Sequence, residues 1–72
     1  MTITLNGEPR NLSDGLTLAT LVESLGMKPD RVAMEHNRVL APRTTWASVA
    51  LAEGDQIEVV HFVGGGSPES LP

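Results

Sequence analysis

The pattern of hydrophobic and polar positions divides the chain into short elements and begins with a hairpin. Residues 1–5 alternate between polar and apolar side chains, as a strand with one buried face does. Asn6-Gly7 follows, and this pair tolerates the positive φ angles that a two-residue hairpin turn requires. We therefore predict a return strand over residues 8–12. Pro9 cannot donate a ladder hydrogen bond, so this return strand should lie at a sheet edge.

A helical period replaces the alternation after residue 17. Thr17 is suited to be the N-cap of this helix because its hydroxyl can accept from an unpaired backbone N–H. Gly26 and Pro29 mark the end of the helix. The apolar side chains recur at i, i+3, i+4 and i+7 and form one stripe, which consists of Leu18, Leu21, Val22 and Leu25.

The second half of the chain contains three further segments. Residues 32–40 indicate a shorter hairpin that turns near Asn37. Residues 42–49 lack a clean period and predict an irregular or short helical turn from which Trp46 closes the core. Residues 56–63 are the most strand-like in the sequence. This order of elements favours an α+β roll with one main helix on one face of the sheet.

The last strand changes phase along its length. Ile57 and Val59 occupy one face, but Val60 and Phe62 fall on the opposite face, where polar residues stood before. Either a bulge shifts the register, or Val60 and Phe62 are exposed apolar residues on the open face of the sheet. We favour the exposed patch, which would be a docking surface for another protein.

Composition limits the classes of function. Seventy-two residues with 40% apolar content fit one small globular domain. The net charge is -4 and Phe62 and Trp46 are the only aromatic residues, so a nucleic acid is an unsuitable partner and a basic protein a better one. There is no cysteine, and no apolar run approaches the roughly 20 residues of a membrane span. We expect a cytoplasmic protein that is monomeric by itself and does not bind membranes.

Residues capable of catalysis or metal binding are scattered. His36 and His61 are 25 positions apart, and no carboxylate or further histidine lies at a metal-ligand spacing from either. We therefore interpret them as partly exposed residues at strand ends. The aspartates fall in predicted turns, where they satisfy backbone donors; they are Asp14, Asp30 and Asp55. We expect no active site, metal or bound cofactor.

Three glycines, Gly64, Gly65 and Gly66, follow the last strand. They are consistent with a flexible linker to a polar tail, which divides the chain into a domain over 1–63 and a tail over 64–72. They are equally consistent with a steric role. Three extended residues reach roughly 10 Å from the fold and, without Cβ atoms, pass through a channel too narrow for other residues.

The sequence resembles the ThiS family of thiazole sulfur-carrier proteins. The resemblance covers residues 1–66 in order and spacing, and the ending Val59–Gly66, Val-Val-His-Phe-Val-Gly-Gly-Gly, matches closely. Shorter matches precede it at 6–10, 17–25, 37–39, 42–46 and 53–55. The resemblance implies the ubiquitin-like β-grasp fold with a mixed sheet.

The resemblance also implies a carrier rather than a catalyst. In that family an E1-like adenylyltransferase, ThiF, uses ATP to convert the terminal glycine carboxylate to an acyl-adenylate. A cysteine desulfurase relay then supplies sulfur, and thiazole synthase, ThiG, takes it from the resulting thiocarboxylate. By position, Gly66 would bear the sulfur, and Gly64 and Gly65 would thread the tail into the partner. Val60, Phe62 and Val63 would dock the partner.

One feature departs from the family pattern: Gly66 is followed by Ser67, so its carbonyl is an amide that cannot be adenylated. We expect a protease to remove residues 67–72. The alternatives are residues foreign to the natural protein, a frame-shifted stop, or a degenerate family member.

Three other functions stay open from the sequence. The protein could serve molybdopterin or cysteine synthesis as a sulfur carrier. It could be a ubiquitin-like modifier that forms isopeptide bonds through Gly66. It could also be a β-grasp interaction module that forms no conjugate, in which case Gly66→Ala would leave its function intact.

Overall fold

The structure, a computed structural model, describes residues 1–63 and 67–70. Strands β1 (Thr2–Leu5) and β2 (Glu8–Asn11) form the predicted hairpin. Asn6 and Gly7 at its turn have φ angles of 49° and 82°, in the left-handed region where both residue types are tolerated. Strand β2 is exposed along its whole length and lies at one end of the sheet order, so the edge position expected from its proline is confirmed.

Helix α1 (Leu18–Ser24) begins where its capping residue predicts. The Thr17 N–H donates to Oγ1 of Thr20 at 2.7 Å, and the Thr20 N–H donates to Oγ1 of Thr17 at 3.2 Å. This reciprocal capping satisfies donors that the first turn of a helix leaves unpaired. The helix ends before Gly26, whose φ of 74° belongs to the left-handed conformation that stops helices.

A one-turn 3-10 helix, η1 (Pro29–Arg31), leads into the second hairpin. This hairpin consists of β3 (Val32–His36) and the two-residue strand β4 (Val39–Leu40), with His36 opposite Val39. The hairpin predicted over 32–40 is therefore confirmed.

A second 3-10 helix, η2 (Arg43–Ser48), fills the segment that lacks a clean period. It buries Trp46, which is 2% exposed and donates its indole N–H to the Ala41 carbonyl oxygen at 2.8 Å. The guanidinium carbon of Arg43 lies 5.6 Å from the centroid of the indole ring, within range of a cation–π contact. The core position predicted for Trp46 is confirmed.

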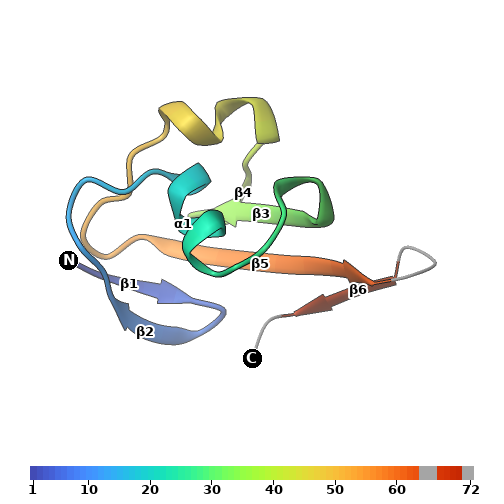
Figure 1. Ribbon diagram of the computed structural model, residues 1–72. Coiled ribbons are helices and arrows are strands. Elements are labelled where there is room, and N and C mark those ends of the chain that lie inside the picture. Colours follow the sequence, from blue (N-terminus) through green and yellow to red (C-terminus); the bar gives the residue numbers. More distant parts are fainter. Residues whose placement is uncertain (64–66, 71–72) are drawn as a thin grey trace.

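Strand β5 (Gln56–Val63) is the centre of the sheet, whose order is β2-β1-β5-β3-β4 (Figure 1). It runs parallel to β1 and antiparallel to β3, so the sheet is mixed. A further strand, β6 (Ser67–Ser70), pairs antiparallel with the end of β5.

Helix α1 covers one face of the sheet, and the core lies between them (Figure 1). This arrangement confirms the α+β roll with one main helix. In the part of the chain that the structure describes, no helix has the length and apolar character needed to cross a membrane. The buried core residues are Ile3, Leu5, Leu18, Leu21, Val22, Val32, Met34, Trp46, Leu51, Ile57 and Val59.

Candidate functional site

The pairing of β5 with β3 decides between a bulge and an open-face patch. The register advances one residue at a time from Ile57 to His61, so no bulge interrupts it. Val60 and Phe62 therefore point to the face opposite Val59 and the core. Both side chains are partly buried rather than fully exposed.

Val60 and Phe62 each line a hollow beside β4. Phe62 borders one hollow of about 190 Å³ together with Trp46 and Leu40. Val60 borders another of about 90 Å³, also lined by Leu40. Leu40 is 68% exposed and connects the two hollows into one surface. We call Leu40, Val60 and Phe62 the apolar patch.

Leu40 is not among the docking residues predicted from the sequence. The available signal was two adjacent apolar residues, Val39 and Leu40, directly after a hairpin turn. In a strand of only two residues at the end of the sheet order, both remain largely exposed, at 67% and 68%. Isolated exposed apolar residues are ordinary on protein surfaces, but a group beside apolar hollows is characteristic of docking sites.

Two carboxylates border the apolar patch. Glu35 on β3 lies directly opposite Glu58 on β5, and both line the hollow beside Val60. Both residues are exposed, and neither forms an ion pair within residues 1–63. Like charges directly opposite each other on neighbouring strands repel, so a cation placed between them would be favoured.

The predicted carrier terminus follows directly from the strand that carries the patch. Val63 is the last residue of β5, and its side chain lies outside the described part of the structure. Gly64, Gly65 and Gly66 also lie outside the described residues. The roles assigned to these four residues stay predictions.

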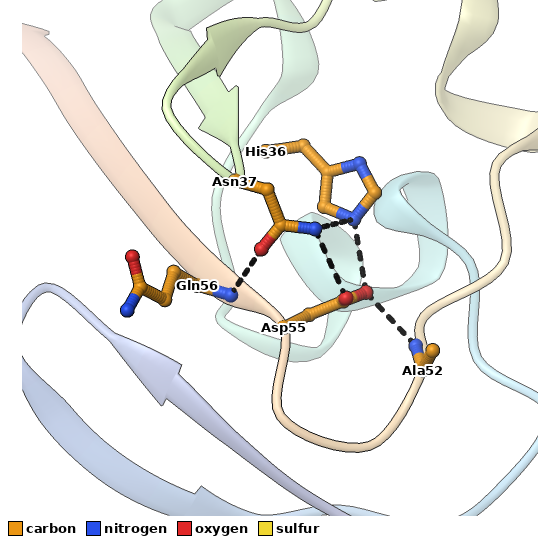
Figure 2. A network of polar contacts seen from close by, with 5 residues as sticks. All are labelled: His36, Asn37, Ala52, Asp55 and Gln56. Atoms are coloured by element: carbon orange, nitrogen blue, oxygen red, sulfur yellow. Dashed lines mark hydrogen bonds and ion pairs between the residues drawn. The ribbon is translucent and has the colours of Figure 1, made fainter.

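The opposite end of β5 holds a polar network that sequence reasoning did not find (Figure 2). Oδ2 of Asp55 lies 2.9 Å from Nε2 of His36 and accepts from the Ala52 N–H at 2.9 Å. Oδ1 of Asp55 accepts from the side-chain amide of Asn37 at 3.1 Å, and the oxygen of that amide accepts from the Gln56 N–H at 2.8 Å. These contacts tie the β3–β4 turn to the turn before β5.

Asp55 is only 8% exposed, so its ionisation depends on this network. Burial raises the pKa of Asp55, but the hydrogen bonds from the Ala52 N–H, His36 and Asn37 outweigh it and lower the pKa below its ordinary value. The predicted role of this residue as an acceptor for local backbone donors is confirmed. Its pairing with His36 lacked a sequence signal because the two residues are 19 positions apart.

The two histidines do not come together. His36 is 25% exposed at the end of β3, and His61 is partly buried on β5 opposite Val32. Within 1–63 and 67–70, no group of three or more histidine or acidic side chains could hold a metal ion.

Comparison with known sequences identifies relatives over most of the chain. The sequence model of the ThiS family matches residues 3–66. A thiazole synthase from Magnetococcus marinus is 53% identical over 66 residues, which are 92% of this chain and 20% of that protein. The chain thus spans about one fifth of the length of that relative. The sulfur carrier protein ThiS of Escherichia coli is 30% identical over 66 residues, which are 92% of this chain and 100% of the carrier.

The same relationship is visible in three dimensions. The crystal structure of the thiamine biosynthesis protein ThiS from Geobacter metallireducens matches with a TM-score of 0.78 at 28% identity, and the match covers 92% of this chain and 100% of that one. The expected β-grasp fold, with a mixed sheet and one main helix, is confirmed.

Proposed function

The chain belongs to the ThiS family of sulfur carriers, and we propose that Gly66 is the residue on which it carries sulfur into the thiazole of thiamine. The observation that carries this proposal is the extent of the family match, which runs from Ile3 to Gly66. Gly66 stands three residues after a strand whose open face bears the apolar patch. A docked partner would therefore receive the glycine residues next to its binding surface.

The chemistry requires a partner to activate the terminus. A carboxylate is a poor electrophile until one of its oxygens becomes part of a good leaving group, and adenylation by an E1-like enzyme (ThiF) with ATP achieves this. Persulfide sulfur from a cysteine desulfurase relay then attacks the acyl-adenylate and displaces AMP, and a thiol reductant cleaves the resulting acyl disulfide, which leaves the thiocarboxylate on the chain and a disulfide on the reductant side. In this scheme the chain is a cosubstrate, and ATP is bound by the partner. We place these reactions in the cytoplasm.

The apolar patch supplies the docking surface in this proposal. Val60 and Phe62 contribute apolar area, and Leu40 lines the hollows that they border. We assign Val63, the last residue of β5, to the same docking surface. Glu35 and Glu58, which form no ion pair among the described residues, favour a partner that places a basic side chain against them. Thiazole synthase (ThiG) is the proposed sulfur acceptor, supported by the thiazole synthase of which one fifth is similar to this chain.

Activation also requires a free carboxylate on Gly66. In this sequence Gly66 is joined to Ser67 by a peptide bond, and an amide carbonyl has no oxygen that can attack ATP as a carboxylate does. We include in the proposal a protease that cleaves between Gly66 and Ser67 before adenylation.

The test is reconstitution with purified components. The chain ending at Gly66, the full chain, and a Gly66→Ala version of the shortened chain would each be incubated with the adenylyltransferase, ATP, the desulfurase relay, cysteine and a thiol reductant. Intact-mass spectrometry should detect the exchange of one oxygen for sulfur in the first protein only. The alanine version is the matched control, because it keeps the carboxylate and adds one methyl group in the narrow channel.

The competing outcomes are distinct. A shortened chain that stays unmodified while still binding the adenylyltransferase would favour an interaction module. Conjugates of higher mass in a cell lysate would favour a protein modifier. Either result would contradict the proposed carrier role.

A further inference from the structure

One edge of β5 is covered by β1 only in part. The Asn6 N–H, just after β1, donates to the Ile57 carbonyl oxygen at 2.9 Å. Two residues further along β5, the Asn6 side chain takes the place of a neighbouring strand. Its amide nitrogen donates to the Val59 carbonyl oxygen at 3.1 Å, and its oxygen accepts from the Val59 N–H at 2.8 Å. Asn6 thus closes this edge as far as Val59, and neither β1 nor β2 pairs with β5 beyond it.

The next backbone groups on this edge belong to His61 and Val63. Backbone N–H and C=O groups of alternate strand residues point to the same edge, and Ile57 and Val59 point toward β1. His61 and Val63 must therefore direct theirs to the same side. The pairing partners on that side are Glu69 for His61 and Ser67 for Val63, both in β6.

The register of β6 agrees with its proline. Pro68 lies opposite Phe62, whose backbone groups point toward the other edge of β5. At such a non-hydrogen-bonded pair the missing proline N–H would face away from β5, so Pro68 costs no ladder hydrogen bond. A shift by one residue would place Pro68 where an N–H donor is needed.

Pairing of β6 conflicts with presentation of the glycine residues. Ser67 lies opposite Val63, and β6 runs back antiparallel along the end of β5. The two strands lie side by side in Figure 1. Four residues of extended chain would instead separate these positions by roughly 13 Å. A tail threaded into a narrow channel therefore requires β6 to leave the edge of β5.

We propose that β6 is an intramolecular latch, which occupies the free edge of β5 and prevents presentation of Gly66 until the residues from Ser67 onward are released or removed. The latch rests on the proposed carrier role of Gly66. Cleavage after Gly66 would then have two linked results, a free carboxylate and an uncovered strand edge.

The first test measures the pairing without any partner protein. Glu69→Pro removes an N–H that faces β5, whereas the matched control Ser70→Pro removes one that faces away, because Ser70 lies opposite Val60. Glu69→Gln controls for the lost charge. All the buried core residues fall within positions 3–59 of the sequence, so these changes and truncation after Gly66 should leave the domain folded.

Hydrogen exchange of the His61 and Val63 amides, followed by NMR, is the measurement. We expect both amides to exchange at least about tenfold more slowly in the full chain and in Ser70→Pro than in Glu69→Pro and in the chain ending at Gly66. Equal exchange in the full chain and the shortened chain would overturn the latch. Equal exchange in the two proline variants would overturn its register.

The second test measures the effect on docking. The adenylyltransferase should bind full-length Glu69→Pro about tenfold more tightly than full-length Ser70→Pro. In Ser70→Pro the closed latch leaves only a small fraction of the molecules able to bind, whereas in Glu69→Pro the latch is already open. Equal affinities would overturn the latch as a barrier to docking, even if the chain ending at Gly66 still accepts sulfur. A shortened chain that binds but accepts no sulfur would instead overturn the carrier role, whatever the exchange result.

Discussion

The two ends of β5 are built in different ways. At the start of the strand, the carboxylate of Asp55 is 8% exposed and engages three donors, and Asn37 fixes the backbone of Gln56. At its end, Phe62 borders an open hollow, and beyond Val59 the edge of β5 on the β1 side is paired with β6 within the described residues. Hydrogen bonds and burial concentrate at one end of the strand, and apolar surface at the other.

If the apolar patch is the docking surface that we propose, this small domain separates stability from docking along a single strand. A thin core tolerates few unsatisfied groups, so the polar side chains near Asp55 must all be paired. Among the described residues, the other end carries no buried polar network and can present apolar side chains at small cost. Changes at the first end should therefore affect folding, and changes at the second should affect binding.

The largest expected effect comes from placing the same charge on either face of β5. Val59→Glu buries a carboxylate at a site that is 1% exposed and should cost more than about 4 kcal/mol, enough to unfold the domain. Phe62→Glu, on the open face, should cost less than about 1.5 kcal/mol and weaken binding to the adenylyltransferase about 100-fold. Circular dichroism and titration calorimetry would measure the two effects.

The same two variants can also contradict the proposed difference between the two ends of β5. If Phe62→Glu unfolds as Val59→Glu does, Phe62 belongs to the core and the docking argument fails. If it folds and binds the partner with unchanged affinity, the apolar patch is not the docking surface.

Removal of the Asp55 carboxylate should produce the next largest effect. Asp55→Ala leaves the Ala52 N–H, His36 and Asn37 without their acceptor and should lower the free energy of unfolding by about 3 kcal/mol. Urea denaturation would measure it. Asp14→Ala is the control, since the Asp14 side chain is 90% exposed and forms a surface ion pair with the amino terminus. Equal losses in both variants would contradict a special role for the network.

The Asn6 side chain should contribute somewhat less. Asn6→Gly keeps the positive φ of the turn but removes both side-chain bonds to Val59, and it should cost about 2 kcal/mol. Asn6→Asp keeps the oxygen that accepts from the Val59 N–H and loses only the donor, so its cost should be intermediate. Denaturation of the three proteins should rank them in that order; a glycine variant as stable as the parent would show that turn conformation alone matters.

The smallest expected effect concerns pH. The folded-state pKa of Asp55 lies below its ordinary value of 3.8, so its stabilising contribution is complete above that value and is lost as the pH falls below it. Asp55→Asn, which has no charge to titrate, should show a shallower loss of stability below pH 3.8. Thermal melts over this acidic range would detect the difference, and parallel curves for the two proteins would assign the acid sensitivity to other carboxylates.

Local signals were sufficient for most of the secondary structure. Asn6-Gly7 predicted the first hairpin, Thr17 and Gly26 the ends of the helix, and Pro9 the edge strand, because each acts on its own backbone or on that of near neighbours. Trp46 was assigned to the core because so large a side chain in a small domain is seldom left outside it.

Contacts between distant residues were beyond such signals. Asn6 and Val59 are 53 positions apart, and nothing at either position indicates that an asparagine side chain will continue the sheet where β1 ends. Strand β6 escaped prediction because residues 67–70 contain a proline and no alternation of apolar residues. Its pairing depends on backbone N–H and C=O groups at one edge of β5. Because nearly every residue type carries these groups, the sequence does not indicate which of them will pair.

The central claim, that the chain carries sulfur on Gly66, is tested most directly by the intact mass of the protein isolated from its native cells with thiols preserved. We expect a species that ends at Gly66, part of which carries the mass increase of one oxygen exchanged for sulfur. A protein that always continues past Gly66 and never carries sulfur would contradict it.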